Sequence, residues 1–547
     1  MFRKNNVKIE QQSLLSKEHE WSDYKLTRLQ QSWAGVFRKQ ILPNINEDSY
    51  SVLYSDKASR PNTPVNYLVG LLIIKSIQGL SDEELLDAAL YNEMVQYALG
   101  TLDYVDQPIS KNMISNFRVR LYEYSKKTGI DLFENTMREI NEELISLSKI
   151  DKSLNRIDSL MISSSCKRMA RTELIYTVNE RFIKLLNKLN KNIDEEFKAY
   201  LEEDNSTEVL YRTKEAEIGG KLTLLLNHSI KLYNDNKDDA DINCTEEFNQ
   251  LKRLIDDQYD STNSKPKDGK DIKPTSLQTP YDAKATYRYK YQGNVGYVGN
   301  VVETVDQEKE LSLITYWSVA PNIKSDTEFM EEIIDAKEGE DVVTEITDAA
   351  YISAELIEKA GAKNIILHPT DLTGKKDTKE TNLSKFEIDE NNNITKCPNE
   401  IVPTATNYNN EKNKITAEFD KHDCATCSQR DKCPIVELKR KNKLSTTIGQ
   451  IKYAQLKENR NLDEYKEISK LRSAIEGIPS ILRRKYRIDE RPTKGVSYLK
   501  MVFSTSILSI NIKRIAKYER NHLNNDENNT LITKIYNTIN NLCYRFI

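Results

Sequence analysis

The chain has 547 residues, of which 38% are hydrophobic and 30% are charged, and its formal net charge is -4. A chain of this length exceeds what one hydrophobic core supports, so we expect several domains or a core with large insertions. The sequence has neither the roughly 20 consecutive apolar residues of a membrane span nor the apolar run of a signal peptide, which predicts a cytoplasmic protein. The net charge excludes uniform coating of DNA, so any nucleic-acid contact must rest on local clusters of Lys and Arg.

Residues 1–150 are predicted to form a helical N-terminal domain. Two helices are separated by Gly79, and the second begins with Ser81 and Glu84, the spacing of a capping box. A further helix from about residue 110 carries Lys111 and Arg118 beside an apolar stripe, a pattern compatible with entry into a DNA major groove. The alternative is a helix that only packs on its neighbours and solvates its basic face.

The following segments predict an α/β fold with a mixed-sheet core, assembled from residues 151–170 and 280–375. The first strand lies at 155–165, and residues 171–279 read as a helical insertion that ends in a polar linker. Residues 376–450 read as a second, polar insertion, and 451–547 as a long helix with a basic C-terminal region. The later core elements are predicted strands at 296–306, 311–321, 342–351 and 362–369, with a helix at 353–361.

Three carboxylates fall at positions from which they could converge. Asp158 lies in the first strand, Asp348 ends a later strand, and Glu476 lies in the helix predicted at 465–487. Phosphodiester cleavage by two metal ions needs such hard oxygen ligands around ions about 3.5 to 4 Å apart. Because the chain holds 84 acidic residues, spacing alone would not select these three.

A family resemblance does select them. The resemblance is to bacterial insertion-sequence transposases, which join an InsH-like N-terminal domain to a DDE catalytic domain. It covers nearly the whole chain apart from residues 180–270. It is carried, in chain order, by RPNTPVNYLVGLLIIKSIQGLSDEEL, NRIDSLMISSS, YDAKATYRYKYQGNVGYVGNVVE, EITDAAYIS and LRSAIEGIPSILRR.

The resemblance implies a ribonuclease H-like core in which Asp158, Asp348 and Glu476 coordinate Mg²⁺ or Mn²⁺. It further implies cut-and-paste movement of a DNA element, in which a homodimer binds the terminal inverted repeats, cleaves the double-stranded DNA and joins the freed 3′-hydroxyl to target DNA. Two alternatives remain open. One is a repressor or domesticated DNA-binding protein without catalysis, and the other is a metal-dependent nuclease that cuts without strand transfer.

One departure from the family pattern concerns the residues around the glutamate. Related transposases often carry a tyrosine seven residues before it, where this chain has Ser469. Arg472 lies four residues before Glu476, and Arg483 and Arg484 follow it. We expect Arg472 and Arg483 to bind phosphate, the alternative being a solvated basic helix face.

Four cysteines predict a structural zinc site in the 376–450 insertion, which looks too hydrophilic to build a core of its own. His422 could replace one thiol, and the alternative is reduced cysteines without metal. The four are Cys397, Cys424, Cys427 and Cys433, and a similar cluster occurs in the resembling family.

Two basic stretches are predicted to contact DNA. Residues 481–520 hold eleven Lys or Arg against three acidic residues, which favours phosphate binding. The tract at 286–291 interleaves aromatic residues with Arg288 and Lys290, which suits stacking on unpaired bases but also describes an ordinary exposed strand. His368, after an apolar strand, is interpreted as structural rather than as a neighbour of the metals. The candidate contacts in the first stretch are Arg483, Arg484, Lys485 and Arg487.

Overall fold

The computed structural model describes residues 2–5, 16–55, 57, 61–104, 107–110, 112–211, 214–290, 292–370, 381–491 and 494–543, with side chains up to residue 522 except 215, 381 and 382. Lys111, one of the predicted DNA contacts, lies outside these residues. Within the described part, no helix is both long and apolar enough to cross a membrane.

The N-terminal region is helical, as predicted. The capping box at the start of α4 is confirmed, because the Ser81 hydroxyl accepts from the Glu84 amide and the Glu84 carboxylate accepts from the Ser81 amide. The preceding helix ends at Gly79, whose φ of 75° is the left-handed conformation that glycine adopts without strain. The helices are α1 (Asp23–Gln30), α2 (Trp33–Val36), α3 (Val65–Gln78), α4 (Asp82–Tyr91), α5 (Glu93–Leu99), α6 (Met113–Thr128) and α7 (Leu132–Ser148).

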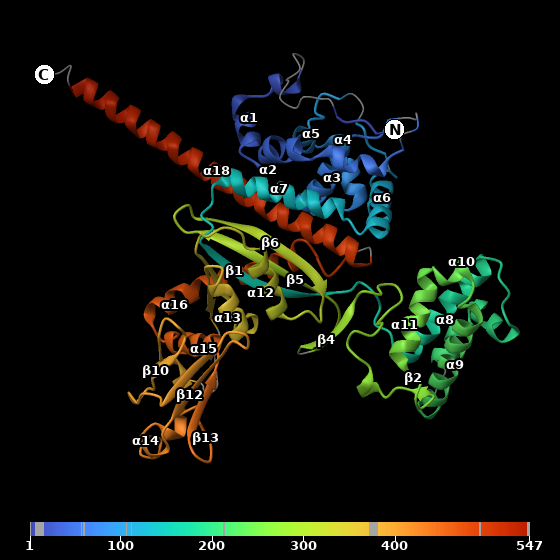
Figure 1. Ribbon diagram of the computed structural model, residues 1–547. Coiled ribbons are helices and arrows are strands. Elements are labelled where there is room, and N and C mark those ends of the chain that lie inside the picture. Colours follow the sequence, from blue (N-terminus) through green and yellow to red (C-terminus); the bar gives the residue numbers. More distant parts are fainter. Residues whose placement is uncertain are drawn as a thin grey trace.

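A mixed sheet forms the centre of the molecule (Figure 1). Its strands run β6-β5-β1-β7-β8, and β4 pairs with the far end of β5. The pairs β6·β5 and β5·β1 are antiparallel, whereas β1·β7 and β7·β8 are parallel. The strand bounds are β1 (Leu154–Ser163), β4 (Thr286–Lys290), β5 (Gln292–Asp306), β6 (Leu311–Pro321), β7 (Val343–Thr347) and β8 (Ile365–Pro369).

Two helices connect the later strands of the sheet. The helix α13 (Ala354–Gly361) between β7 and β8 is the one predicted. The helix α12 (Asp326–Ala336) between β6 and β7 was not predicted, although Ser325 and Glu328 form a capping box at its start. The capping-box spacing, followed by apolar residues at helical intervals, was the signal that could have found it.

One hydrophobic core joins the two ends of the chain to one face of the sheet. The C-terminal helix α18 (Val496–Cys543) packs between the N-terminal helices and β6 and then runs out of the body of the molecule (Figure 1). Its Phe503 is fully buried, and a Cβ added to Gly299 of β5 would meet the Phe503 ring at 2.7 Å. The sheet and the N-terminal helices are therefore held in one rigid arrangement by a helix more than 300 residues downstream of both β1 and the N-terminal region.

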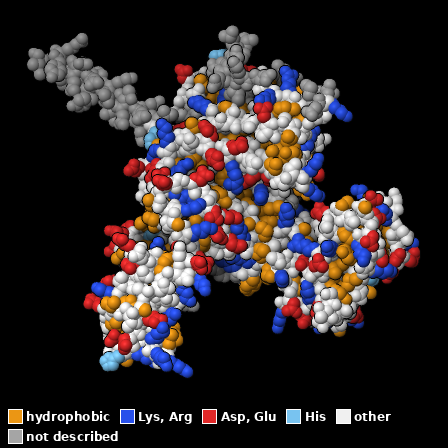
Figure 2. All heavy atoms as spheres, viewed as in Figure 1, with side chains coloured by type: hydrophobic (Ala, Val, Ile, Leu, Met, Phe, Trp, Pro, Cys, Tyr) orange, Lys and Arg blue, Asp and Glu red, His pale blue; other side chains and the backbone are white. Residues whose placement is uncertain are grey.

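The stretch between β1 and β4 forms a helical lobe that stands apart from the sheet (Figures 1 and 2). Its buried apolar residues, among them Phe182, Leu226 and Leu251, form a cluster separate from the central core. A helix bundle with its own core can be inserted in a loop without disturbing the sheet. The helices are α8 (Arg171–Lys188), α9 (Ile218–Asn236), α10 (Ala240–Asn243) and α11 (Glu246–Gln258).

The second insertion corrects a prediction. It was expected to be too hydrophilic for a core, yet Ile394, Ile415, Phe419 and Leu444 are buried in one apolar cluster. Alternation explains the error, since along β12 only every second residue is buried. Small sheets carry this lobe: β9 (Glu387–Ile388) with β10 (Ile394–Lys396), and β11 (Ala405–Asn409), β12 (Lys414–Phe419), β14 (Asn442–Thr446) and β13 (Val436–Glu437) in that order.

Candidate active site

Asp158 projects from the central strand of the sheet. Only Leu154, Asn155 and Arg156 of β1 pair with β7, and a segment from the C-terminal quarter of the chain packs beside the rest of the strand. There the Arg483 guanidinium donates to the Met161 carbonyl at 2.8 Å, and the Ser163 amide donates to Asp489 at 2.8 Å. The strand that carries the first aspartate is thus attached directly to the segment that carries the glutamate.

Asp348 directly follows β7 and precedes a short 3-10 helix, Ala349–Tyr351. Since β1 and β7 are parallel neighbours, a residue at the carboxyl end of β7 lies at the same edge as the later residues of β1. The Asp348 side chain is 43% exposed, compared with 18% for Asp158. The second aspartate is therefore the more accessible of the two.

Glu476 is the last residue of a 3-10 segment that lies between two α-helices. The sequence predicted one helix over 465–487, whereas the structure has α16 (Asp463–Lys470), a 3-10 segment η12 (Leu471–Glu476) and α17 (Gly477–Arg484). Ile475, Ile478 and Leu482 are buried against the core. A 3-10 stretch within a helix often marks a functional position, and here it holds both Arg472 and Glu476.

The Arg472 guanidinium lies among the three carboxylates. Its Nη2 is 3.9 Å from Asp158 Oδ1 and 3.9 Å from Asp348 Oδ2, and its Nη1 is 3.9 Å from Glu476 Oε1. Only 13% of the Arg472 side chain is exposed. Residues from two strands and one helix, far apart in sequence, therefore meet around one cationic group.

The electrostatics of the site are dominated by the partial burial of Asp158. Burial raises the pKa of its carboxyl, and the nearby carboxylates of Glu476 and Asp348 add to the rise. The Ser159 amide, which donates to Asp158 at 2.9 Å, and the Arg472 cation act in the opposite direction. Three carboxylates this close repel one another unless a positive charge lies between them, and Arg472 supplies it.

The predicted zinc site is not supported by the structure. Within the described part of the chain, no three His, Cys, Asp or Glu side chains are grouped in a way that could hold a metal ion as they stand. Cys397 and Cys424 are buried in the apolar cluster of the second insertion, and Cys427 and Cys433 are partly buried. Burial, with a contribution from neighbouring thiols, raises the pKa of Cys433. An apolar cluster that includes Ile415, Phe419 and Leu444 forms the core of this lobe.

Several predicted DNA contacts are engaged within the protein. Arg118 forms a two-pronged ion pair with Asp82, at 2.8 and 2.9 Å. Arg288 donates to the carbonyls of Asn322 and Lys324 at 3.2 and 3.3 Å. The predicted contacts that are exposed on the surface are Lys290, Arg483, Arg484, Lys485 and Arg487.

The sequence did not identify the group that supports the glutamate segment. His368, at the end of β8, is buried, and its Nε2 lies 3.0 Å from the Ser469 hydroxyl. Its ring stacks on Tyr465 with the centroids 3.8 Å apart, and the Tyr465 hydroxyl donates to the Pro369 carbonyl at 2.6 Å. These contacts agree with the structural role that the sequence suggested for His368. A tyrosine one helical turn before Ser469 was the available signal.

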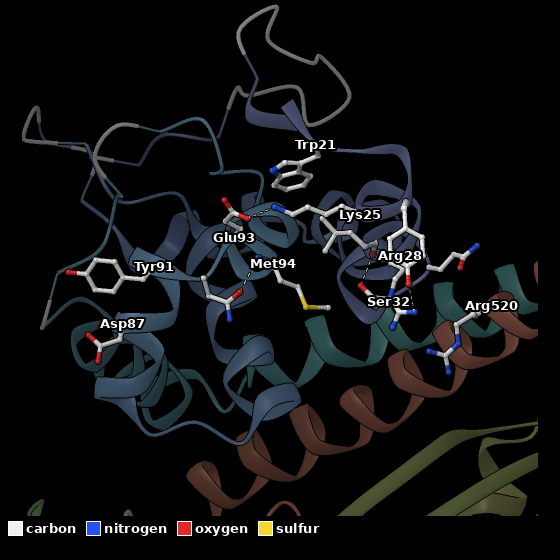
Figure 3. A pocket seen from close by; sticks show the side chains of 13 residues that line it. Trp21, Lys25, Arg28, Ser32, Asp87, Tyr91, Glu93, Met94 and Arg520 are labelled. Carbon is white, nitrogen blue, oxygen red and sulfur yellow. Dashed lines mark hydrogen bonds and ion pairs between the residues drawn. The ribbon is translucent and has the colours of Figure 1, made fainter. Parts of the chain in front are cut away.

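A cavity of about 990 Å³ lies elsewhere, in the N-terminal region (Figure 3). Trp21, Lys25 and Glu93 line it, and the Lys25 ammonium bonds Glu93 at 2.7 Å. None of the three clustered carboxylates contributes to its lining. This cavity is therefore separate from the candidate active site.

Two segments of the chain match known protein families. Residues 396–516 match the family described as "Transposase DDE domain", and residues 31–120 match the one described as "Transposase domain (DUF772)". No curated protein and no solved structure matches the chain. The two transposase domains indicate a DDE-type insertion-sequence transposase. The first match includes Glu476 and Arg472, whereas Asp158 and Asp348 lie outside both matches.

Proposed function

We propose that the chain binds the terminal inverted repeats of an insertion sequence and catalyses metal-dependent cleavage and strand transfer of DNA. The observation that carries this proposal is the meeting of Asp158, Asp348 and Glu476 around the Arg472 guanidinium. The strand order, with an antiparallel β6-β5-β1 unit beside a parallel β1-β7-β8 unit, supports a ribonuclease H-like core.

As they stand, the three carboxylates do not form a group that could hold a metal ion in the described part of the chain, but the chemistry of these side chains suits a divalent cation such as Mg²⁺ or Mn²⁺. All three side chains are hard oxygen donors, and the guanidinium among them is a cation that already occupies the space between them. Asp158, Asp348 and Glu476 would hold the metal, which supplies activation of water or a 3′-hydroxyl and stabilisation of the leaving oxygen. Binding requires Arg472 to move aside, and the displaced guanidinium is then placed to bind a DNA phosphate.

The remaining basic residues are assigned to the DNA backbone. The exposed Arg484, Lys485 and Arg487 lie at the end of α17 opposite Glu476, so a phosphate backbone lying along α17 would run from the carboxylates to them. Lys290 adds a further cation on β4. A protein that bridges two DNA ends must act as a pair of copies, and we propose a homodimer in the cytoplasm.

The test is a cleavage assay with the purified chain, Mg²⁺ and a DNA fragment that bears the inverted repeat flanking its gene. Asp348→Asn should lower the cleavage rate at least about a thousandfold, because a metal ligand is lost. Asp463→Asn, an exposed carboxylate at the start of α16, is the matched control and should leave the rate unchanged.

Each of the other outcomes contradicts part of the proposal. Cleavage that survives Asp348→Asn would reject the metal assignment. Cleavage without joining would identify a nuclease. DNA binding without cleavage would identify a repressor.

A further inference from the structure

A buried ion-pair network includes Arg156, which lies two residues before Asp158 on β1. Arg156 on β1 and Glu303 on β5 are cross-strand partners, with the Arg156 Nη2 at 2.6 Å from Glu303 Oε2. The side chain of Arg156 is 8% exposed and that of Glu303 is 1% exposed. The other oxygen of Glu303 lies 2.7 Å from the Arg514 guanidinium of α18. One buried carboxylate is thus shared by two arginines.

The second arm of Arg156 reaches the segment that carries the glutamate. Its Nη1 donates to the Leu471 carbonyl at 2.7 Å, and Leu471 is the first residue of η12. Arg156 and Asp158 are two residues apart on one strand, so their side chains share a face of the sheet. A single side chain therefore connects the strand of Asp158 to the turn that carries Arg472 and Glu476.

The charge balance indicates that Arg156 does more than neutralise the Glu303 carboxylate. Arg514 already supplies a full positive charge to Glu303, and it also donates to the Ser312 carbonyl at 3.0 Å. A guanidinium presents its donors in a rigid planar fork, which allows Arg156 to bind a carboxylate and a carbonyl at once. A lysine ammonium at this position would keep the charge but lose the fixed geometry.

We infer that Arg156 is a positioning residue, which holds η12 against β1 so that Glu476 and Arg472 meet Asp158. The role of the positioned groups in metal binding rests on the proposed function, whereas the positioning itself does not. Loss of the Arg156 arm should loosen η12 at its Leu471 end, while the buried Ile475, the sheet and α18 remain in place. Amide hydrogen exchange of residues 471–476 measures this directly and needs no catalysis.

The experiment compares Arg156→Lys with Arg514→Lys in the full chain. Both variants keep a cation beside Glu303, but only the first loses the fork to Leu471. We expect exchange at 471–476 to rise about tenfold or more in Arg156→Lys and to stay at the wild-type rate in Arg514→Lys. Equal exchange at 471–476 in the two variants would overturn the inference.

A second variant separates positioning from charge neutralisation if a buried lysine impairs folding. Arg156→Met combined with Glu303→Gln and Arg514→Met removes all three charges of the network together and retains the side-chain volumes approximately. If Arg156 only neutralises Glu303, slow exchange at 471–476 and Mg²⁺-dependent cleavage should both return. If Arg156 positions η12, exchange at 471–476 stays fast in this variant. Provided that the wild-type chain cleaves DNA, the variant's cleavage rate at saturating Mg²⁺ should also stay about tenfold or more below that of wild type.

The readouts also separate this inference from the proposed function. A wild-type chain that does not cleave DNA contradicts the function, while fast exchange confined to Arg156→Lys still supports the positioning role. A wild-type chain that cleaves, together with unchanged exchange and cleavage in Arg156→Lys, rejects the positioning role and leaves the function intact.

Discussion

The Arg472 guanidinium lies 3.9 Å from the Asp158 carboxylate and stands between it and the other two acidic groups of the site. A cation at this position stabilises three carboxylates in the absence of metal and competes with metal for the same oxygens. The relationship makes metal loading and the position of Arg472 mutually dependent.

Arg472→Gln should therefore bind Mg²⁺ more tightly than the wild-type chain. Removal of the competing cation from a partly buried site is expected to be worth about 1–2 kcal/mol, or roughly tenfold in affinity. Isothermal titration of the chain with MgCl₂ measures the change. Arg487→Gln is the control, because the Arg487 side chain is 75% exposed and pairs with Glu490 rather than with a carboxylate of the site. Equal Mg²⁺ affinity in Arg472→Gln and wild type would show that the guanidinium does not compete.

Glu345 should make stability depend on pH. It is buried on β7 beside Asn155, whose amide donates to it at 2.8 Å, and burial raises its pKa from 4.5 to about 7. The folded state keeps the proton that the unfolded chain loses, so this contribution to stability is complete below about pH 4.5 and is lost as the pH rises through about 7.

Glu345→Gln mimics the protonated group and should be more stable than wild type by about 3 kcal/mol at pH 8, with little difference at pH 4.5. Urea unfolding at the two pH values measures the change. The exposed Glu340→Gln is the control and should behave as wild type at both. A stability gain for Glu345→Gln that is the same at both pH values would refute the assignment.

Substitution of Arg118 should change stability, whereas substitution of Lys290 should change DNA binding. Arg118 is bound to Asp82, and its guanidinium is the leading cause of a strongly lowered Asp82 pKa. Arg118→Ala should cost about 1 kcal/mol of stability, since the pair is partly exposed, and leave DNA affinity unchanged. Lys290→Ala should leave stability unchanged and reduce the salt dependence of DNA binding by about one ion. Thermal unfolding measures the change in stability, and binding isotherms at several salt concentrations measure the change in DNA binding. Weaker DNA binding by Arg118→Ala would count against the structural role of Arg118.

Gly299 should tolerate no side chain. A Cβ there would meet the Phe503 ring at 2.7 and 2.8 Å, so Gly299→Ala is expected to lose about 1–3 kcal/mol through overpacking. Phe503→Leu in the same chain should recover part of the loss, because the smaller side chain leaves room for the methyl group. Additive losses in the double variant, measured by urea unfolding, would mean that the two residues do not share the contact.

The local elements followed from the sequence to a large extent. The strands predicted at 155–165, 296–306 and 311–321 and the capping box at Ser81 rest on short-range signals, and the structure confirms each of them. The helix α12 was not predicted although its capping box was present, and the core of the lobe around Phe419 was not predicted because only every second residue of β12 is buried. Both features are encoded locally, by the capping box of α12 and by the alternation of apolar residues in β12.

The candidate site depends more strongly on tertiary structure than the local elements do. The sequence by itself determined which residue types are available: two aspartates at strand positions, a glutamate on a helix and an arginine one turn before it. Only the tertiary structure decided that Arg472 lies among all three carboxylates, that Arg118 is bound to Asp82, and that Arg156 reaches the Leu471 carbonyl. Such contacts depend on strand register and on the docking of α18 and η12. These are long-range consequences of burying one shared core, and neither propensity nor spacing along the chain encodes them.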